Sequence, residues 1–204
     1  MPRRSAPHEP AKRGYHHGNA RNALLTAAAG LLEKLGAASL SLRQVAERAG
    51  LSRQAPYNHF KNKEALLAEL AREGYERLAA SLAASRDAQG RNSLERAAES
   101  YIRRAQEAPA LFRLMFSREL VDLARFPAAA QAGAAAFEAL KDIVATCAPA
   151  DRVADLALAA WSLVHGYATL CIEVALEPAD RRAERARLFA RILRAAAATS
   201  DAHH

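Results

Sequence analysis

The segment from Ser41 to Phe60 constrains the fold more than any other part of the chain, because it combines two helix starts with one turn. Ser41 is a suitable N-cap, and Gln44 stands three residues later, where the partner of a capping box belongs. Gly50 can take the left-handed conformation that ends a helix, and Ser52 can cap a second helix. The pattern predicts two short helices joined by a tight turn.

This pattern has two interpretations. It is typical of a DNA-reading helix-turn-helix, whose second helix begins with polar residues, but an αα-hairpin in an ordinary helical core would also give it. The charge distribution favours the first. Residues 1–63 contain 11 Lys and Arg against 3 Asp and Glu, whereas residues 64–204 contain 18 against 19. Positive charge concentrated at one end is typical of phosphate binding, and solubility alone does not require it.

The run from Ser39 to Leu67 resembles the N-terminal DNA-binding domain of TetR-type transcriptional regulators. The residues that carry the resemblance are Ser41, Leu42, Val45, Ala46, Ala49, Gly50, Leu51, Ser52, Tyr57, His59, Phe60, Lys63, Glu64 and Leu67. Residues 15–19, Tyr-His-His-Gly-Asn, resemble the opening of one subgroup of that family. Residues 161–166 resemble the Trp-x-x-x-His-Gly signature of one class of its C-terminal domains. The resemblance implies a dimeric regulator that binds double-stranded operator DNA.

The candidate base-reading residues lie at the start of the second helix. Arginine suits guanine, and glutamine or asparagine suits adenine, by bidentate hydrogen bonding. We therefore expect base contacts from Arg53, Gln54, Ala55 and Asn58, together with a base or phosphate contact from Arg43 on the preceding helix.

Other residues of this region are expected at the DNA backbone. The family resemblance implies phosphate contacts for Ser41, Tyr57, His59 and Lys63, and the DNA-binding set also includes Ser52. Tyr57 could instead pack in the core, as we expect of Phe60. Pro56 lacks a backbone donor, so we expect 3₁₀ or bent geometry in the second helix.

The fold class is all-α, because alanine and leucine dominate, strand formers are sparse and only 9 glycines and 8 prolines interrupt the chain. We expect about nine helices: a three-helix N-terminal helix-turn-helix domain and a C-terminal helical domain for ligand binding and dimerisation. The expected divisions are a basic arm over 1–14, a DNA-binding domain over 15–66 and an effector and dimerisation domain over 67–204. The arm should be disordered; it is either a solvated tail or a minor-groove contact.

Prolines and helical periodicity divide the second domain into five helices. The expected ranges are Ser93–Ala108, Ala110–Leu123, Ala128–Cys147, Ala150–Leu176 and Ala179–Ala198. The fourth is apolar nearly all round and is expected to be buried on both sides. The last has an apolar face formed by Leu188, Phe189, Ile192 and Leu193. Two such helices from each protomer can form an intermolecular four-helix bundle.

Several classes of protein are disfavoured. The sequence has no Gly-rich phosphate loop, Gly-x-Ser-x-Gly, His-Glu-x-x-His or Cys-x-x-Cys, so we expect neither an enzyme nor a cofactor. His16 and His17 are adjacent and cannot face one metal ion on a helix, and no metal is expected. Cys147 and Cys171 are expected to be buried thiols in a reducing cytoplasm. No apolar run approaches about 18 residues, so no membrane span is expected.

A ligand pocket is expected in the second domain. Its candidate lining residues are Tyr101, Phe112, Met115, Phe116, Phe137, Trp161 and His165, although each could be a core residue. Their composition favours a small, mostly apolar effector held by one or two hydrogen bonds. The expected function is a repressor that such an effector releases from its operator. The alternative is an effector-independent, DNA-bound structural or partner-recruiting protein of the same fold.

Overall fold

The computed structural model describes residues 17–86 and 92–199, and within these ranges it contains helices and no strand. The α-helices are α1 (His17–Ser39), α2 (Leu42–Arg48), α3 (Lys63–Ser85), α4 (Ser93–Glu107), α5 (Pro109–Phe116), α6 (Pro127–Val144), α7 (Val153–Glu173) and α8 (Arg182–Ala198). The 3₁₀ turns are η1 (Ala55–Asn58), η2 (Leu123–Arg125), η3 (Ala150–Arg152) and η4 (Ala179–Arg181). The all-α prediction is confirmed. The expected basic arm, the His16-His17 pair and the side chains of residues 15–19 lie outside the part that is described.

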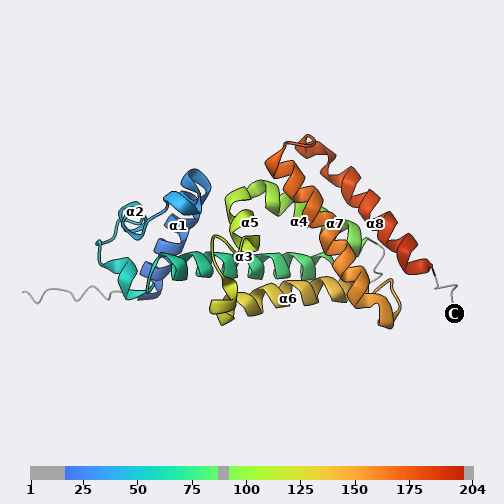
Figure 1. Ribbon diagram of the computed structural model, residues 1–204, viewed down its shortest axis with the longest axis horizontal. Helices are drawn as coiled ribbons and strands as arrows, with labels where there is room; N and C mark the ends of the chain where they lie inside the picture. The colour runs from blue at the N-terminus through green and yellow to red at the C-terminus, as the bar shows by residue number, and fades with distance from the viewer. Residues whose placement is uncertain (1–16, 87–91, 200–204) are drawn as a thin grey trace, which may run out of the picture.

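The molecule is elongated, with α1, α2 and η1 at one end and α7 and α8 towards the other (Figure 1). We call residues 17–62 the head and residues 92–199 the body. Helix α3 connects them: it leaves the head and packs lengthwise against α6, its most extensive contact. Its inward leucines Leu67, Leu70, Leu78 and Leu82 are each at most 4% exposed, as its periodicity predicts. The body is completed by α4, which packs against α3, α7 and α8.

Local signals determine the structure of the head. Ser41 caps α2 in a complete capping box, in which its backbone N donates to Gln44 Oε1 at 2.9 Å. Gly36 (φ 75°) and Gly50 (φ 67°) both adopt left-handed conformations, the first at a kink in α1 and the second after α2. The predicted capping box and turn are confirmed.

The second helix of the expected pair is the 3₁₀ turn η1, as the position of Pro56 predicts. The prediction that Ser52 caps it is wrong. The N-cap is Gln54, which makes no side-chain capping bond, and the Ser52 carbonyl accepts from Ala55 N at 3.0 Å. That bond closes a separate turn before η1, whose own first bond runs from Tyr57 N to the Gln54 carbonyl at 3.1 Å, so the cap position moves from Ser52 to Gln54.

Helix α5 is shorter than predicted. It ends at Phe116, where Ser117 has extended backbone angles, rather than continuing to Leu123. The chain then turns at Asp122, whose side chain accepts from Ala124 N at 3.3 Å, and this local bond competes with helix formation. Val121 is 2% exposed and anchors the segment in the core.

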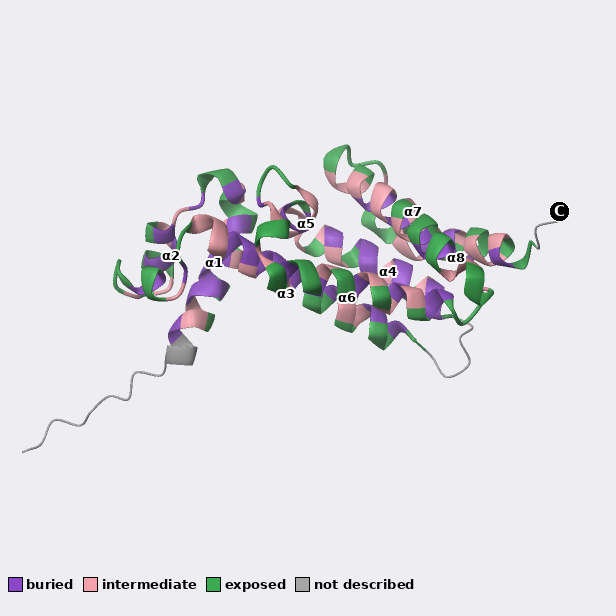
Figure 2. Cartoon of the chain, turned by 60° about the horizontal axis from the view of Figure 1, so that its bottom comes forward, coloured by how far each residue is buried: buried purple, intermediate pink, exposed green. Residues whose placement is uncertain are grey.

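Helix α7 is not buried on both sides, contrary to the prediction. Leu158, Leu170 and Val174 are 59%, 48% and 62% exposed, and Ile192 of α8 is 47% exposed. Figure 2 shows green, exposed segments along both α7 and α8. One protomer covers only the face of α7 that meets α4, α6 and α8. The segment Ala150–Glu173 is also long and apolar enough to cross a membrane, contrary to the expectation of no such run. This is weak evidence for a span, because core helices of soluble proteins meet the same criteria.

The two cysteines are both free thiols, as predicted. Cys171 is half-buried, but Cys147 is exposed, which corrects the expectation that both are buried. Cys147 lies three residues after Val144, the last residue of α6, in the exposed turn that follows this helix.

Candidate DNA-binding surface and effector site

The tip of the head presents exposed polar residues around a small buried base. The exposed members of the predicted DNA-binding set are Arg43, Ser52, Arg53, Gln54, Tyr57 and Asn58. Ala55 and Pro56 are buried between them and fix η1 against α2 and α1. Tyr57 is 55% exposed, so it is not a core residue, whereas Phe60 is 4% exposed and is one. We refer to these six exposed residues as the tip surface.

The other members of the predicted set are already engaged. Ala55 is 5% exposed, so its methyl group is not free to reach a base edge, and we remove it from the base-reading candidates. The Ser41 hydroxyl donates to Gln44 Oε1 at 2.7 Å within the capping box. Lys63 Nζ donates to the Ala38 carbonyl at 2.7 Å, and His59 is half-buried beside Phe60.

Ion pairing differs between the tip of the head and its base, which is the end that meets α3. Within residues 17–86 and 92–199, Arg43 and Arg53 form no ion pair. At the base, Arg21 pairs with Glu69 of α3 at 2.5 Å and lies over the Phe60 ring at 5.6 Å. The tip surface is therefore positively charged without internal neutralisation.

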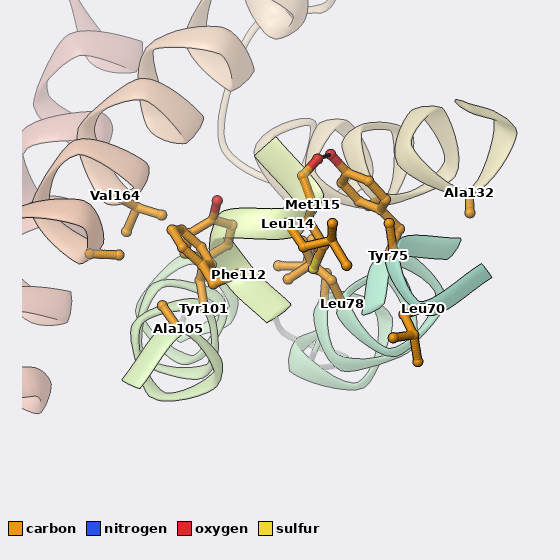
Figure 3. Packing of buried hydrophobic residues seen from close by; sticks show 14 of the residues in the cluster. Leu70, Tyr75, Leu78, Tyr101, Ala105, Phe112, Leu114, Met115, Ala132 and Val164 are labelled. Atoms are coloured by element: carbon orange, nitrogen blue, oxygen red, sulfur yellow. Dashed lines mark hydrogen bonds between the residues drawn. The ribbon is translucent and has the colours of Figure 1, made fainter. Parts of the chain in front are cut away.

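The expected pocket residues gather in the body from four helices. Tyr101 comes from α4, Phe112, Met115 and Phe116 from α5, Phe137 from α6, and Trp161 and His165 from α7. Six of the seven form one set of ring contacts, which we call the aromatic cluster. Its centroid distances range from 4.5 Å for Phe116–His165 to 6.3 Å for Tyr101–His165. Met115 packs beside this cluster, and its carbonyl accepts from the Tyr75 hydroxyl at 2.5 Å (Figure 3).

The aromatic cluster contains one internal polar pair. Tyr101 Oη and His165 Nδ1 lie 2.9 Å apart and form a hydrogen bond. Burial raises the pKa of the Tyr101 phenol and lowers the pKa of the His165 imidazole below its usual value of 6.5. Both groups are therefore neutral near pH 7, and the bond occupies the Nδ1 ring nitrogen of His165.

Three cavities border the aromatic cluster; the smallest, of about 30 Å³, is lined by Tyr101 and Trp161 among others, and the two larger ones adjoin α5. One, of about 320 Å³, lies between α5 and α7 and is lined by Phe112, Phe116 and His165 among others. The second, of about 210 Å³, lies between α3, α4 and α5 and is lined by Phe112, Tyr101 and Met115 among others. Phe112 belongs to both linings, so its ring separates the two spaces. Trp161 and Phe137 pack on each other, 5.6 Å apart, away from both.

Helix α5 is attached to the head as well as to the body. The Glu33 carboxylate of α1 accepts from Ala110 N at 3.0 Å and from Leu111 N at 2.9 Å. It thereby satisfies two of the free donors at the start of α5 and places a negative charge at the positive end of that helix. Beyond α5, Arg125 donates to Glu64 of α3 at 2.8 Å. A movement of α5 would therefore be transmitted to the head through these contacts.

Sequence reasoning missed Glu33 and also Arg104, which lines the smaller cavity. Nothing local marks Glu33, because its partners lie 77 and 78 residues away in the chain. Arg104 did carry a signal. Arg104 is three residues after Tyr101 and four residues before Ala108. Residues at this spacing share one face of a helix, so Arg104 lies on the same inward-facing side of α4 as Tyr101.

Comparisons with known proteins cover both halves of the chain. Residues 24–70 match the model of the bacterial regulatory proteins of the tetR family, and residues 94–199 match the tetracyclin repressor-like C-terminal domain. No curated protein matches the sequence.

Solved structures are similar over most of the chain. A protein of unknown function from Rhodococcus sp. RHA1 is 31% identical, with a TM-score of 0.72 over 88% of this chain and 98% of its own. A tetR-family regulatory protein from Rhodococcus RHA1 is 20% identical, with a TM-score of 0.65 over 85% and 96%. The TetR-family transcriptional regulator PfmR from Thermus thermophilus is 23% identical, with a TM-score of 0.60 over 83% and 96%.

Proposed function

The chain belongs to the tetR family of bacterial regulatory proteins, and on that premise we propose that it is a repressor which a small, mostly apolar effector releases from its operator. Members of this family are DNA-binding transcriptional regulators, not enzymes. The finer elements of the proposal are the operator-reading residues, the homodimer and the effector response. We place the protein in the cytoplasm, with the domain boundary after Leu66 inside α3.

The tip surface is the observation that carries the proposal. Arg53, Gln54 and Asn58 are exposed and project from a turn that is fixed by buried residues. Side chains of these types read base edges in the major groove. Tyr57 and Arg43 flank them and supply phosphate contacts, which position the head without reading sequence. Ser41, His59 and Lys63 would reach phosphates only by giving up or sharing their present contacts.

The exposed apolar face of α7 and α8 supports a homodimer. Leu158, Leu170 and Val174 together with Ile192 form a surface that water would otherwise cover. Two copies of this helix pair can bury it in a four-helix bundle. A dimer then presents two heads to half-sites about one helical turn of DNA apart, roughly 34–36 Å.

The attachment of α5 supports an effector response. Phe112, Met115 and Phe116 lie on this helix, and Glu33 of the head holds its first turn. An effector that enters beside Phe112 must displace α5 or reorder it. The ligand then acts by favouring a position of the heads that no longer fits the operator, through its different affinity for the two states.

The test begins with DNA. Sequences bound by the full chain are selected from genomic fragments, and their affinity is measured by fluorescence anisotropy with and without members of a small-molecule library. We expect nanomolar operator binding and at least one apolar compound that weakens it and raises the melting temperature. His165→Ala should blunt the effect of that compound and leave operator affinity without it nearly unchanged.

Two results would contradict the proposal. Operator binding that no compound alters would favour the alternative, an effector-independent DNA-bound structural or partner-recruiting protein. Loss of operator binding by His165→Ala without any ligand would make His165 a core or interface residue.

A further inference from the structure

The cavity between α3, α4 and α5 combines an apolar wall with charged groups. Its apolar wall includes Leu78, Phe112 and Met115, which Figure 3 shows gathered from these helices close to Tyr101. Its charged groups are Arg77, Arg104 and Glu107. Two guanidinium groups and one carboxylate give the lining a net charge of +1. A lining of this kind suits a ligand with one negative charge and an apolar body.

The guanidinium of Arg104 is the group that most needs a partner. Its Nε atom is buried, and no acceptor within residues 17–86 and 92–199 reaches it. Burial, with a further contribution from neighbouring Arg103, lowers the pKa of Arg104 below its ordinary value. A buried cationic nitrogen without an acceptor is costly, and such groups are usually completed by a hydrogen-bond acceptor, which can be an ordered water molecule or an anion.

The other charged groups of the lining are already close to opposite charges. Arg77 donates to Glu73 at 2.8 Å, and Glu107 lies 4.0 Å from Arg103 Nε. Among the described side chains, none forms an ion pair with Arg104. The positive charge of the cavity is therefore centred on Arg104, three residues along α4 from Tyr101.

We propose that the effector is an amphipathic carboxylic acid, bound as its carboxylate by Arg104, with its apolar part against Phe112 and Met115. This assignment rests on the proposed effector response. The two terminal amino groups of an arginine also form a planar fork that matches the two oxygens of a carboxylate. A doubly charged phosphate ester would exceed the net charge of the lining, so a carboxylate fits better.

Phe112 connects the binding of such a ligand to the head through α5. It lines both cavities beside α5 and lies on the helix whose first turn Glu33 holds. An acid seated on Arg104 presses its apolar part on the Phe112 ring, and displacement of that ring opens the way towards His165. The carboxylate thus fixes one end of the effector, and α5 responds to the other.

The first experiment compares acids with their uncharged counterparts. Octanoate and 3-phenylpropanoate, and the matched octanamide and 3-phenylpropanamide, are titrated into the full chain by calorimetry. We expect at least one acid to bind at least 10-fold more tightly than its amide. Arg104→Gln should weaken that acid by about 10- to 100-fold, because a charge-assisted hydrogen bond pair is lost, and should leave the amide unchanged.

Arg103→Gln is the matched control, because Arg103 neighbours Arg104 on α4 but does not line this cavity. Because Arg103 lies 4.0 Å from Glu107 of the lining, its loss should weaken acid binding only slightly and far less than Arg104→Gln does. Equal binding of the acid by Arg104→Gln and Arg103→Gln would overturn the assignment, as would the failure of both acids to bind.

A second readout needs no ligand. Arg104→Leu removes the buried nitrogen and should raise the melting temperature of the unliganded protein by a few degrees. A fall in melting temperature would mean that the guanidinium is already satisfied and would overturn the proposal.

Operator affinity separates this proposal from the proposed function. If an acid binds through Arg104 without changing operator affinity, the carboxylate site stands and the release mechanism is wrong. If a neutral compound releases the operator equally from the parent and from Arg104→Gln, release stands and the carboxylate assignment is wrong.

Discussion

The head and the body use polar side chains in opposite ways. The head is organised by bonds between neighbours in the chain, such as Ser41 with Gln44, and displays its functional candidates on the outside. In the body, buried or half-buried polar groups join distant segments: Tyr101 and His165 are 64 residues apart, and Met115 bonds to Tyr75 of α3, 40 residues away. Substitutions at the tip surface should therefore change DNA binding without changing stability, whereas substitutions in the aromatic cluster should change stability and ligand binding together.

The largest effect is expected on dimer formation, at the apolar side chains that α7 and α8 of the body leave exposed. Ile192→Asp should leave an isolated protomer folded, because the side chain is 47% exposed there. In a dimer it would bury an unpaired charge and cost about 3–5 kcal/mol of association free energy. Analytical ultracentrifugation should show monomers, and operator affinity should fall with the loss of the second head. A variant that remains dimeric would place the interface elsewhere.

The second largest effect is expected on DNA binding, when residues of the tip surface and the neighbouring Lys63 are substituted. Gln54→Ala should cost about 1–3 kcal/mol at one operator position and relax preference there. Lys63→Ala should weaken all sequences alike and reduce the salt slope by about one. Anisotropy titrations on operator and scrambled DNA distinguish them. The base-reading role of Gln54 is wrong if its substitution weakens scrambled DNA as much as operator.

A matched pair of tyrosine substitutions compares the two regions directly. Tyr101→Phe removes a hydrogen bond to His165 inside the body and should lower the free energy of unfolding by about 1 kcal/mol. Tyr57→Phe, at an exposed position, should change it by less than about 0.5 kcal/mol, while weakening DNA binding. Urea denaturation of both variants gives the comparison. Equal losses of stability would refute the contrast between head and body.

The smallest effect is the pH dependence of the body. Because burial lowers the pKa of folded His165 below 6.5, the unfolded chain takes up a proton first as pH falls through that value. Stability is therefore complete above about pH 6.5 and declines below it. Between pH 7.5 and 5.5 the parent should lose more unfolding free energy than His165→Gln. Parallel pH profiles for the two would show that His165 does not contribute.

Sequence predicted the head in more detail than the body, because its determinants are close together in the chain. The capping box, the left-handed Gly50 and the 3₁₀ geometry at Pro56 all depend on residues within four positions of one another. The cap of η1 was the exception, because it depends on the type of helix that forms. The burial of Ala55 was not predicted either, since it depends on the packing of η1 against α1 and α2.

In the body, residue type predicted which side chains would cluster, but not how they are arranged around the cavities. All seven pocket candidates lie in or beside the aromatic cluster, but only five of them line the two cavities beside α5, and that outcome depends on the path of α5, whose end was misplaced. An apolar periodicity also does not distinguish a face covered by its own chain from one left for a partner. For that reason α7 was expected to be buried on both sides and is open along Leu158 and Val174.

The Glu33 carboxylate limits how freely this protein could exchange parts with its relatives. A chimera joined after Leu66 would take its α1 from one parent and its α5 from the other, although the two backbone donors of α5 depend on the side chain at position 33. A head from a relative with a neutral residue at position 33 would leave the two N–H groups to be hydrogen-bonded by water. Helix α5 would then lose this attachment to the head. If the proposed effector response holds, such a hybrid would fold and bind DNA but would not respond to the effector unless the acidic residue is transplanted with the body.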